Sequence, residues 1–236
     1  MRPVEQGWIE RSMDWMVEEF GRDRLHAEVV LPSDDYFPGV YRGSHDDVQA
    51  VLERLCQHMD VDPDRVELEP YAAEENPALS AHVPIHSRST GAIGHHRVRD
   101  GRSVIGIRND LARRPMSLVA TMAHELGHVL LLADGRISSQ REDHEPLTDL
   151  LTVFFGLGVF TANAAFEQSR ETRGEYSYTS TSREGYLTEP MYGYALARYA
   201  WLRDEPDPSW VGYLDTNPRV ICKRGLRYLA RAQRTG

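Results

Sequence analysis

The sequence predicts an α+β fold in which a small sheet lies between two groups of helices along the chain. Two observations predict it. Apolar residues recur at helical spacing before residue 60 and again after residue 115. Between them, residues 66–109 alternate as strands do and contain an Asp100-Gly101 hairpin signal. The expected order is therefore two helices, the sheet and then four helices.

The two N-terminal helices are marked by their ends as well as by their periodicity. Residues 5–20 place apolar side chains at helical spacing, and Gly21 follows as a stop signal. A loop rich in proline, glycine and aspartate comes next. Ser44 is a typical N-cap residue, and the helix that it begins has an apolar face up to Met59.

The sheet is expected to contain one strand at 65–71 and a hairpin at 91–109, with a polar loop over 72–90. The second arm of the hairpin, residues 103–107, is short and β-branched. His95 and His96 lie in the first arm. Neighbouring strand residues point to opposite faces, so we do not expect these two histidines to share a metal.

The helices after the sheet follow from proline and glycine positions. Pro115 suits a first helical turn and Gly135 suits the position after the last one, which predicts a helix of about five turns. Pro146 is expected to start a buried helix that runs to about Asn163. Two more helices are expected at 189–203 and 217–232. The sequence thus divides into an N-terminal helical region at 1–65, a core at 66–163 and a C-terminal helical region at 164–236 that completes the same domain.

The composition is that of an ordinary globular protein, with 41% hydrophobic and 27% charged residues in a chain of 236. The net charge of −9 argues against nucleic acid or an anionic membrane as a partner. The longest apolar segment, 150–162, is shorter than the roughly 20 residues that span a bilayer. The N-terminus has no apolar signal-peptide core. We therefore expect a cytoplasmic protein.

Two histidines four residues apart flank a glutamate in the segment "ATMAHELGHVLLL". On a helix His124 and His128 share a face, where two imidazoles can converge on one zinc ion. Glu125 lies beside that line and can take a proton from a water whose pKa zinc has lowered. This H-E-x-x-H pattern (HExxH) is the signature of zinc metallopeptidases. The apolar flanks argue against an accidental motif on an exposed helix, because buried polar side chains need partners.

The third ligand that a catalytic zinc requires has three candidates downstream. Glu145 and Asp149 lie one helical turn apart, and His144 precedes them. Asp149 is a lone charge in an apolar helix, and a buried carboxylate without a partner costs several kcal/mol. One carboxylate can bind the metal while the other orients a ligand histidine. Because Pro146 follows Glu145, we expect Glu145 at the N-cap and not inside the helix.

This arrangement of residues resembles the gluzincin metallopeptidases, in which H-E-x-x-H is followed by E-x-x-x-D. The resemblance covers about 40 of the 236 residues. It implies one Zn²⁺ per chain, with Glu145 as the third ligand and Asp149 hydrogen-bonded to a ligand histidine. The expected layout of a small mixed sheet, active-site helix, glutamate helix and C-terminal helices is similar to the zincin-like minigluzincin core, which includes the ImmA/IrrE-type proteins.

The resemblance also suggests how a substrate would be held. A second donor usually helps the metal to stabilise the carbonyl oxygen. In thermolysin-like enzymes it is a histidine or tyrosine from the C-terminal part. This chain has no histidine after His144, so we expect a tyrosine or an arginine, and the segment offers Arg183, Tyr186, Tyr192, Tyr194 and Tyr199. Of these, Tyr186 and Tyr192 are the residues that we favour. Gluzincin substrates commonly add a strand to a sheet edge, and residues 103–107 resemble that edge strand.

The sequence thus predicts a zinc-dependent peptidase, a gluzincin-like hydrolase with Glu125 as general base, acting on a specific intracellular peptide or protein. One alternative is a regulatory or interaction protein that uses the same zinc-binding scaffold with little or no turnover. A second is a hydrolase of another bond that uses the same metal-activated water. The sequence does not determine the oligomeric state.

Overall fold

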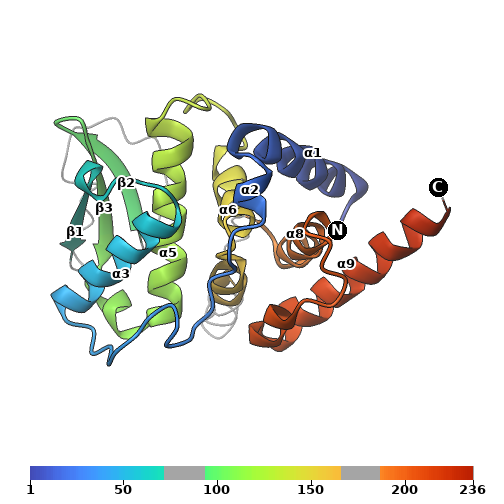
Figure 1. Ribbon diagram of the computed structural model, residues 1–236. Helices are drawn as coiled ribbons and strands as arrows, with labels where there is room; N and C mark the ends of the chain where they lie inside the picture. The colour runs from blue at the N-terminus through green and yellow to red at the C-terminus, as the bar shows by residue number, and fades with distance from the viewer. Residues whose placement is uncertain (72–93, 166–186, 236) are drawn as a thin grey trace, which may run out of the picture. The chain divides into compact units, whose positions relative to one another are not determined.

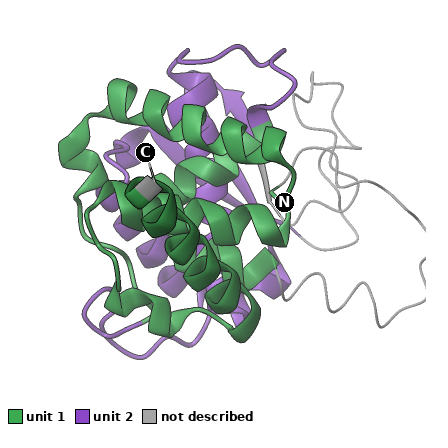
Figure 2. Cartoon of the chain, turned by 90° about the vertical axis from the view of Figure 1, so that its right-hand side faces the viewer, with its two compact units in different colours: residues 1–32, 145–236 green, residues 33–144 purple. Residues whose placement is uncertain are grey.

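The chain has an α+β structure in a computed structural model that describes residues 1–71, 94–165 and 187–235 (Figure 1). Contacts between residues divide it into two compact units (Figure 2). Unit 1 comprises residues 1–32 and 145–236, and unit 2 comprises residues 33–144. The first helix therefore belongs with the C-terminal helices and not with the residues that directly follow it.

The sheet of unit 2 has three strands, β1 (Val66–Tyr71), β2 (Gly94–Arg99) and β3 (Arg102–Arg108). Their order is β1-β3-β2, with β1 parallel and β2 antiparallel to β3. The small mixed sheet is therefore present. Asp100 and Gly101 have φ angles of 50° and 80°, and positive φ at both positions is what the expected two-residue hairpin turn requires.

The central strand is β3, so the expectation that residues 103–107 form an edge strand is wrong. β1 pairs along one side of β3 and β2 along the other. The alternation of the sequence identifies strands, but it carries no information on which strand lies between the others. Among the described strands, the open edges belong to β1 and β2.

Helices α3 (His45–His58) and α5 (Pro115–His128) belong to the same unit as the sheet. The Ser44 hydroxyl accepts a hydrogen bond from the Asp47 N–H, which confirms the expected N-cap of α3. α5 packs against β2 and β3, and α3 packs against α5 (Figure 1). The chain thus places the predicted metal-binding helix directly against the strand pair that precedes it.

The C-terminal end of α5 continues as a π-helical turn, η3 (Val129–Ala133). Gly135 follows it with a φ of 70°, as expected for the end of this helix. The Asp134 carboxylate accepts hydrogen bonds from Arg65 and Arg136, each at 2.6 Å. Arg136 also donates to the Leu130 carbonyl at 2.8 Å, so the helix end is held by charged side chains.

The segment Pro115–Ala133 is the one helix in the described part of the chain that is long and apolar enough to cross a membrane. This is a matter of length and composition alone, and 78% of the segment is buried, which is typical of the core helix of a soluble protein. The segment is longer than the apolar segment 150–162 singled out from the sequence. Its mean hydropathy is high although it includes the polar residues of the H-E-L-G-H motif.

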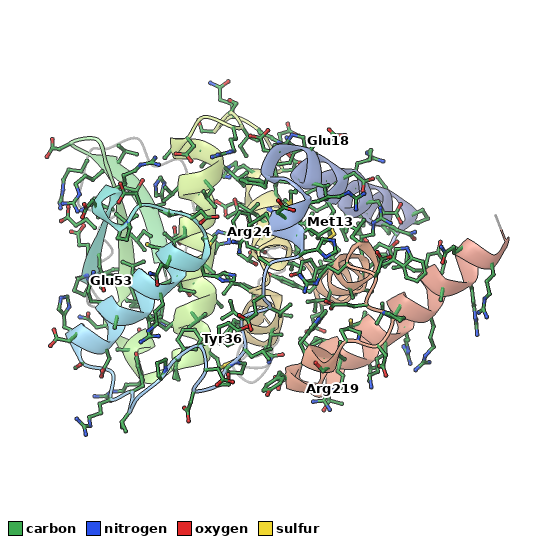
Figure 3. All side chains as sticks on the ribbon, viewed as in Figure 1. Met13, Glu18, Arg24, Tyr36, Glu53 and Arg219 are labelled. Carbon is green, nitrogen blue, oxygen red and sulfur yellow. The ribbon has the colours of Figure 1, made fainter. Side chains whose placement is uncertain are left out.

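Unit 1 is built on α1 (Pro3–Phe20), α8 (Glu189–Leu202) and α9 (Thr216–Thr235), and both α1 and α9 pack against α8. On α1, Met13 is buried and Glu18 is exposed (Figure 3). The short helix α2 (Arg22–Leu25), which was not predicted, helix α6 (His144–Phe154) and the 3₁₀ turn η4 (Ser209–Tyr213) are further elements of the chain. The 3₁₀ turns η1 (Pro63–Arg65) and η2 (Asn109–Arg113) belong to unit 2.

The predicted helix from Pro146 to Asn163 is two helices, α6 and a second one over residues 158–165. The break lies at Gly156, which has a φ of 80° and whose carbonyl accepts a hydrogen bond from Val30. A Cβ there would lie 3.0 Å from the Glu28 carbonyl oxygen. The apolar run continues through the break, so periodicity alone did not reveal it.

The start of α6 also differs from the prediction, because the helix begins at His144 and Glu145 lies inside its first turn. The expectation that Glu145 forms the N-cap is wrong. The N–H groups of a first turn have no helical acceptor, so Pro146 costs the helix no hydrogen bond at that position.

The crossing of α8 and α9 provides a test of packing in unit 1. A Cβ on Gly193 would lie 2.5 Å from Ile221 Cβ, so Gly193→Ala should force the two helices apart and destabilise the protein by about 1–3 kcal/mol. Gly212→Ala is the matched control, because nothing lies within 4 Å of its added Cβ. Urea unfolding of both variants measures the difference, and equal losses would contradict close packing at Gly193.

Candidate metal centre

His124 and His128 lie one turn apart on α5, with ring centroids 4.7 Å apart and ring planes at 88°. Their exposed fractions are 8% and 4%. An apolar helix rarely buries two imidazoles unless they bind something, because each buried nitrogen loses its hydrogen bonds to water. The structure thus places both predicted histidine ligands on one buried helix face.

Glu145 completes the group. The His144 ring centroid lies 6.1 Å from that of His128, and Glu145 is the next residue in the chain. His124, His128 and Glu145 each offer one ligand atom, and these atoms all lie within 4.8 Å of one another. Ligand atoms lie about 2 Å from a shared zinc ion, so small side-chain adjustments would bring all three onto one ion. This buried group of His124, His128 and Glu145 can therefore hold a metal ion, and we call it the metal group.

The chemistry of the donor set fits zinc. Two imidazoles and one carboxylate are a common catalytic zinc set, and such a set leaves a coordination position for water. Other divalent first-row metals also bind imidazole and carboxylate, so the metal's identity is a matter for measurement. All three side chains are 9% exposed or less. Burial of a carboxylate and two imidazoles is costly without partners, and a shared metal ion would provide one.

The two alternative ligands do not join this group within the described parts of the chain. Asp149 lies one turn after Glu145 on α6 and is 4% exposed. Its Oδ2 accepts a hydrogen bond from the Leu187 N–H at 3.0 Å. The buried carboxylate therefore has a main-chain donor. Its expected hydrogen bond to a ligand histidine stays a prediction.

Glu125, the expected general base, follows His124 on the same helix and is 4% exposed. Tyr71, at the end of β1, is a neighbour that the sequence did not suggest. Burial raises the pKa of Tyr71, Arg108 opposes this, and the Glu125 and Asp110 carboxylates raise the pKa further. Tyr71 thus lies within electrostatic range of the expected base. Its position at the end of an ordinary strand gave no signal in the sequence.

The structure describes one of the two tyrosines expected to assist the reaction. Tyr192 lies in the first turn of α8, where it is 3% exposed. Tyr186 lies outside the described residues. The role of both residues stays a prediction.

A further histidine ring close to the metal group, that of His96, was not expected from the sequence. The His96 ring centroid on β2 lies 6.1 Å from that of His128, with the planes at 31°. Alternation along the strand showed that only one of His95 and His96 could point towards a covering helix. Which of the two does so depends on how β2 pairs, and the sequence alone does not fix that register.

No protein-family model matches the chain, and neither a curated protein nor a solved structure matches it. The resemblance to gluzincins therefore rests on the motif residues in the sequence.

The metal group makes a direct prediction about metal content. The protein purified without chelators should contain one zinc per chain by inductively coupled plasma mass spectrometry. His124→Ala and Glu145→Ala should lose it, because each removes one of three ligands. His144→Ala is the matched control and should keep it, since His144 adjoins the group without belonging to it. Zinc that survives Glu145→Ala but is lost in Asp149→Asn would assign the third ligand to Asp149.

Proposed function

We propose that the chain is a zinc-dependent peptidase that hydrolyses a peptide bond with Glu125 as general base. One observation carries the proposal. The buried group of His124, His128 and Glu145 has a further buried carboxylate, Glu125, adjacent in sequence to one of its ligands. A metal held only for structure needs no additional carboxylate, whereas hydrolysis needs a base next to the ion. The proposed substrate is a peptide or protein.

The roles of the chain's own residues follow from this arrangement. When bound, zinc would lower the pKa of a water molecule and polarise the substrate carbonyl. Glu125 would take one proton from the attacking water as the oxygen–carbon bond forms. It would then give that proton to the amide nitrogen as the carbon–nitrogen bond breaks, which releases a free amine and regenerates the carboxylate. Burial of Glu125 on a packed helix holds the base in place for both transfers.

The edge of β2 is the proposed docking site for the substrate main chain. Residues beside a two-residue hairpin turn form a hydrogen-bonded pair, and such pairs alternate with non-hydrogen-bonded ones along the ladder. His96 and Val98 face Ile105 and Ser103 in non-hydrogen-bonded pairs, so their N–H and C=O groups point to the outer edge. A peptide added along this edge would gain main-chain hydrogen bonds without strong sequence selectivity.

Replacement of the base tests the catalytic proposal. Glu125→Gln keeps the shape of the side chain but cannot accept the proton, so kcat should fall about 100- to 10,000-fold while zinc content stays at one per chain. A fluorogenic peptide library measures turnover, and metal analysis of the same samples measures occupancy. Equal, negligible rates in zinc-loaded wild type and variant would favour the regulatory alternative, in which the scaffold binds metal without turnover.

Removal of one outward N–H tests the proposed docking edge. Val98→Pro deletes a donor that β3 does not use, and proline is tolerated on an edge strand at such a position. We expect kcat/KM to fall about tenfold, which is the effect of roughly one lost hydrogen bond, with zinc content unchanged. Val98→Ala keeps the N–H and is the matched control. A similar fall in both variants would point to the side chain and not to the main chain.

A further inference from the structure

His96 combines two features that no other described residue near the metal group shares. Its ring lies 6.1 Å from the ring of the ligand His128, so the side chain points to the face of the sheet against which α5 packs. Its main chain belongs to a non-hydrogen-bonded pair with Ile105 and therefore faces the side of β2 away from β3, where no other described strand pairs. A peptide that pairs with His96 would thus lie beside the imidazole of the same residue.

His96 is not needed to hold the metal. Within the described residues, the ligand group consists of His124, His128 and Glu145 and leaves His96 out. His144 also has its ring 6.1 Å from that of His128, but its main chain forms the start of α6 and not a sheet edge. Of the two flanking histidines, only His96 therefore lies where a bound peptide main chain would run.

Attack of water on a peptide carbonyl places negative charge on the carbonyl oxygen. A metal ion stabilises part of this charge, and a fixed N–H donor beside it typically adds a factor of about 100 to 1,000 in rate. A neutral imidazole always keeps one N–H, so it can donate a hydrogen bond without giving up a proton. Strand β2 is hydrogen-bonded to β3 along its length, which holds such a donor in a fixed position.

We propose that the His96 imidazole donates a hydrogen bond to the substrate carbonyl oxygen and stabilises its negative charge in the transition state. This inference rests on the proposed peptidase function and adds a catalytic residue to it. The proton balance is unchanged, because Glu125 still carries the single proton from water to the amine and His96 keeps its own. His96 thus takes the role that the sequence suggested for Tyr186 or Tyr192.

The test compares His96→Ala and His96→Gln with wild type, with His26→Ala as the matched control. His26 is exposed at the end of α2, where it has no role in the site. We expect His96→Ala to lower kcat about 100-fold with KM changed less than threefold and zinc content unchanged. His96→Gln should recover part of kcat, because its amide also carries an N–H donor.

A phosphinic peptide, whose tetrahedral oxygens stand in for the charged carbonyl oxygen, gives a second readout. Its inhibition constant should rise in His96→Ala by about the factor that kcat falls, while inhibition by a product peptide stays the same. This rules out a merely structural role, because a general distortion of β2 would weaken both inhibitors.

Each other result overturns the proposal in a distinguishable way. Zinc lost from His96→Ala would make His96 a support of the metal site. A raised KM with unchanged kcat would make it a ground-state contact. Wild-type turnover with an unchanged kcat in His96→Ala would remove only the role of His96. No turnover by zinc-loaded wild type would remove the peptidase function itself, and the role of His96 with it.

Discussion

The burial of two imidazoles and two carboxylates among apolar side chains is the constraint on which the candidate site depends. His124, Glu125 and His128 lie on a helix whose other residues are almost all apolar, and their exposed fractions of 4–8% leave little contact with bulk water to replace lost hydrogen bonds. A metal ion would resolve this for three groups at once, because the buried group of His124, His128 and Glu145 can share one ion as its partner. The fourth group, Glu125, lies beside one of these three in the sequence and is the base in the proposed reaction.

The elements that the sequence predicted well are those with a local physical signal. Ser44 caps α3 because its hydroxyl accepts the Asp47 N–H, an interaction that spans three residues. The hairpin at Asp100 and Gly101 forms because both residues adopt positive φ. The ligand pair His124 and His128 was found for the same reason, since helical spacing alone puts the two rings on one face.

The features that the sequence did not reveal depend on distant contacts. The helix break at Gly156 follows from the nearby main chain of Glu28 and Val30, more than 120 residues earlier in the chain. The central position of β3 follows from parallel pairing with β1, which no local pattern encodes. His96 was missed because only the register of β2 decides which of two neighbouring histidines points towards α5.

The ion pairs at the end of η3 give α5 and its π-helical extension an acid-labile anchor. Arg65 directly precedes β1, so the Asp134 carboxylate ties the helix that carries His128 to the start of a strand. Burial opposes ionisation of Asp134, but hydrogen bonds from Arg65 and Arg136 outweigh it and lower its pKa. A lowered pKa in the folded state means that this anchor contributes fully above the unfolded-state pKa of about 3.9 and is lost as the pH falls through the folded value. The ion pairs of Asp134 with Arg65 and Arg136 therefore persist throughout the neutral range, and strong acid would break them even if the apolar core stayed packed.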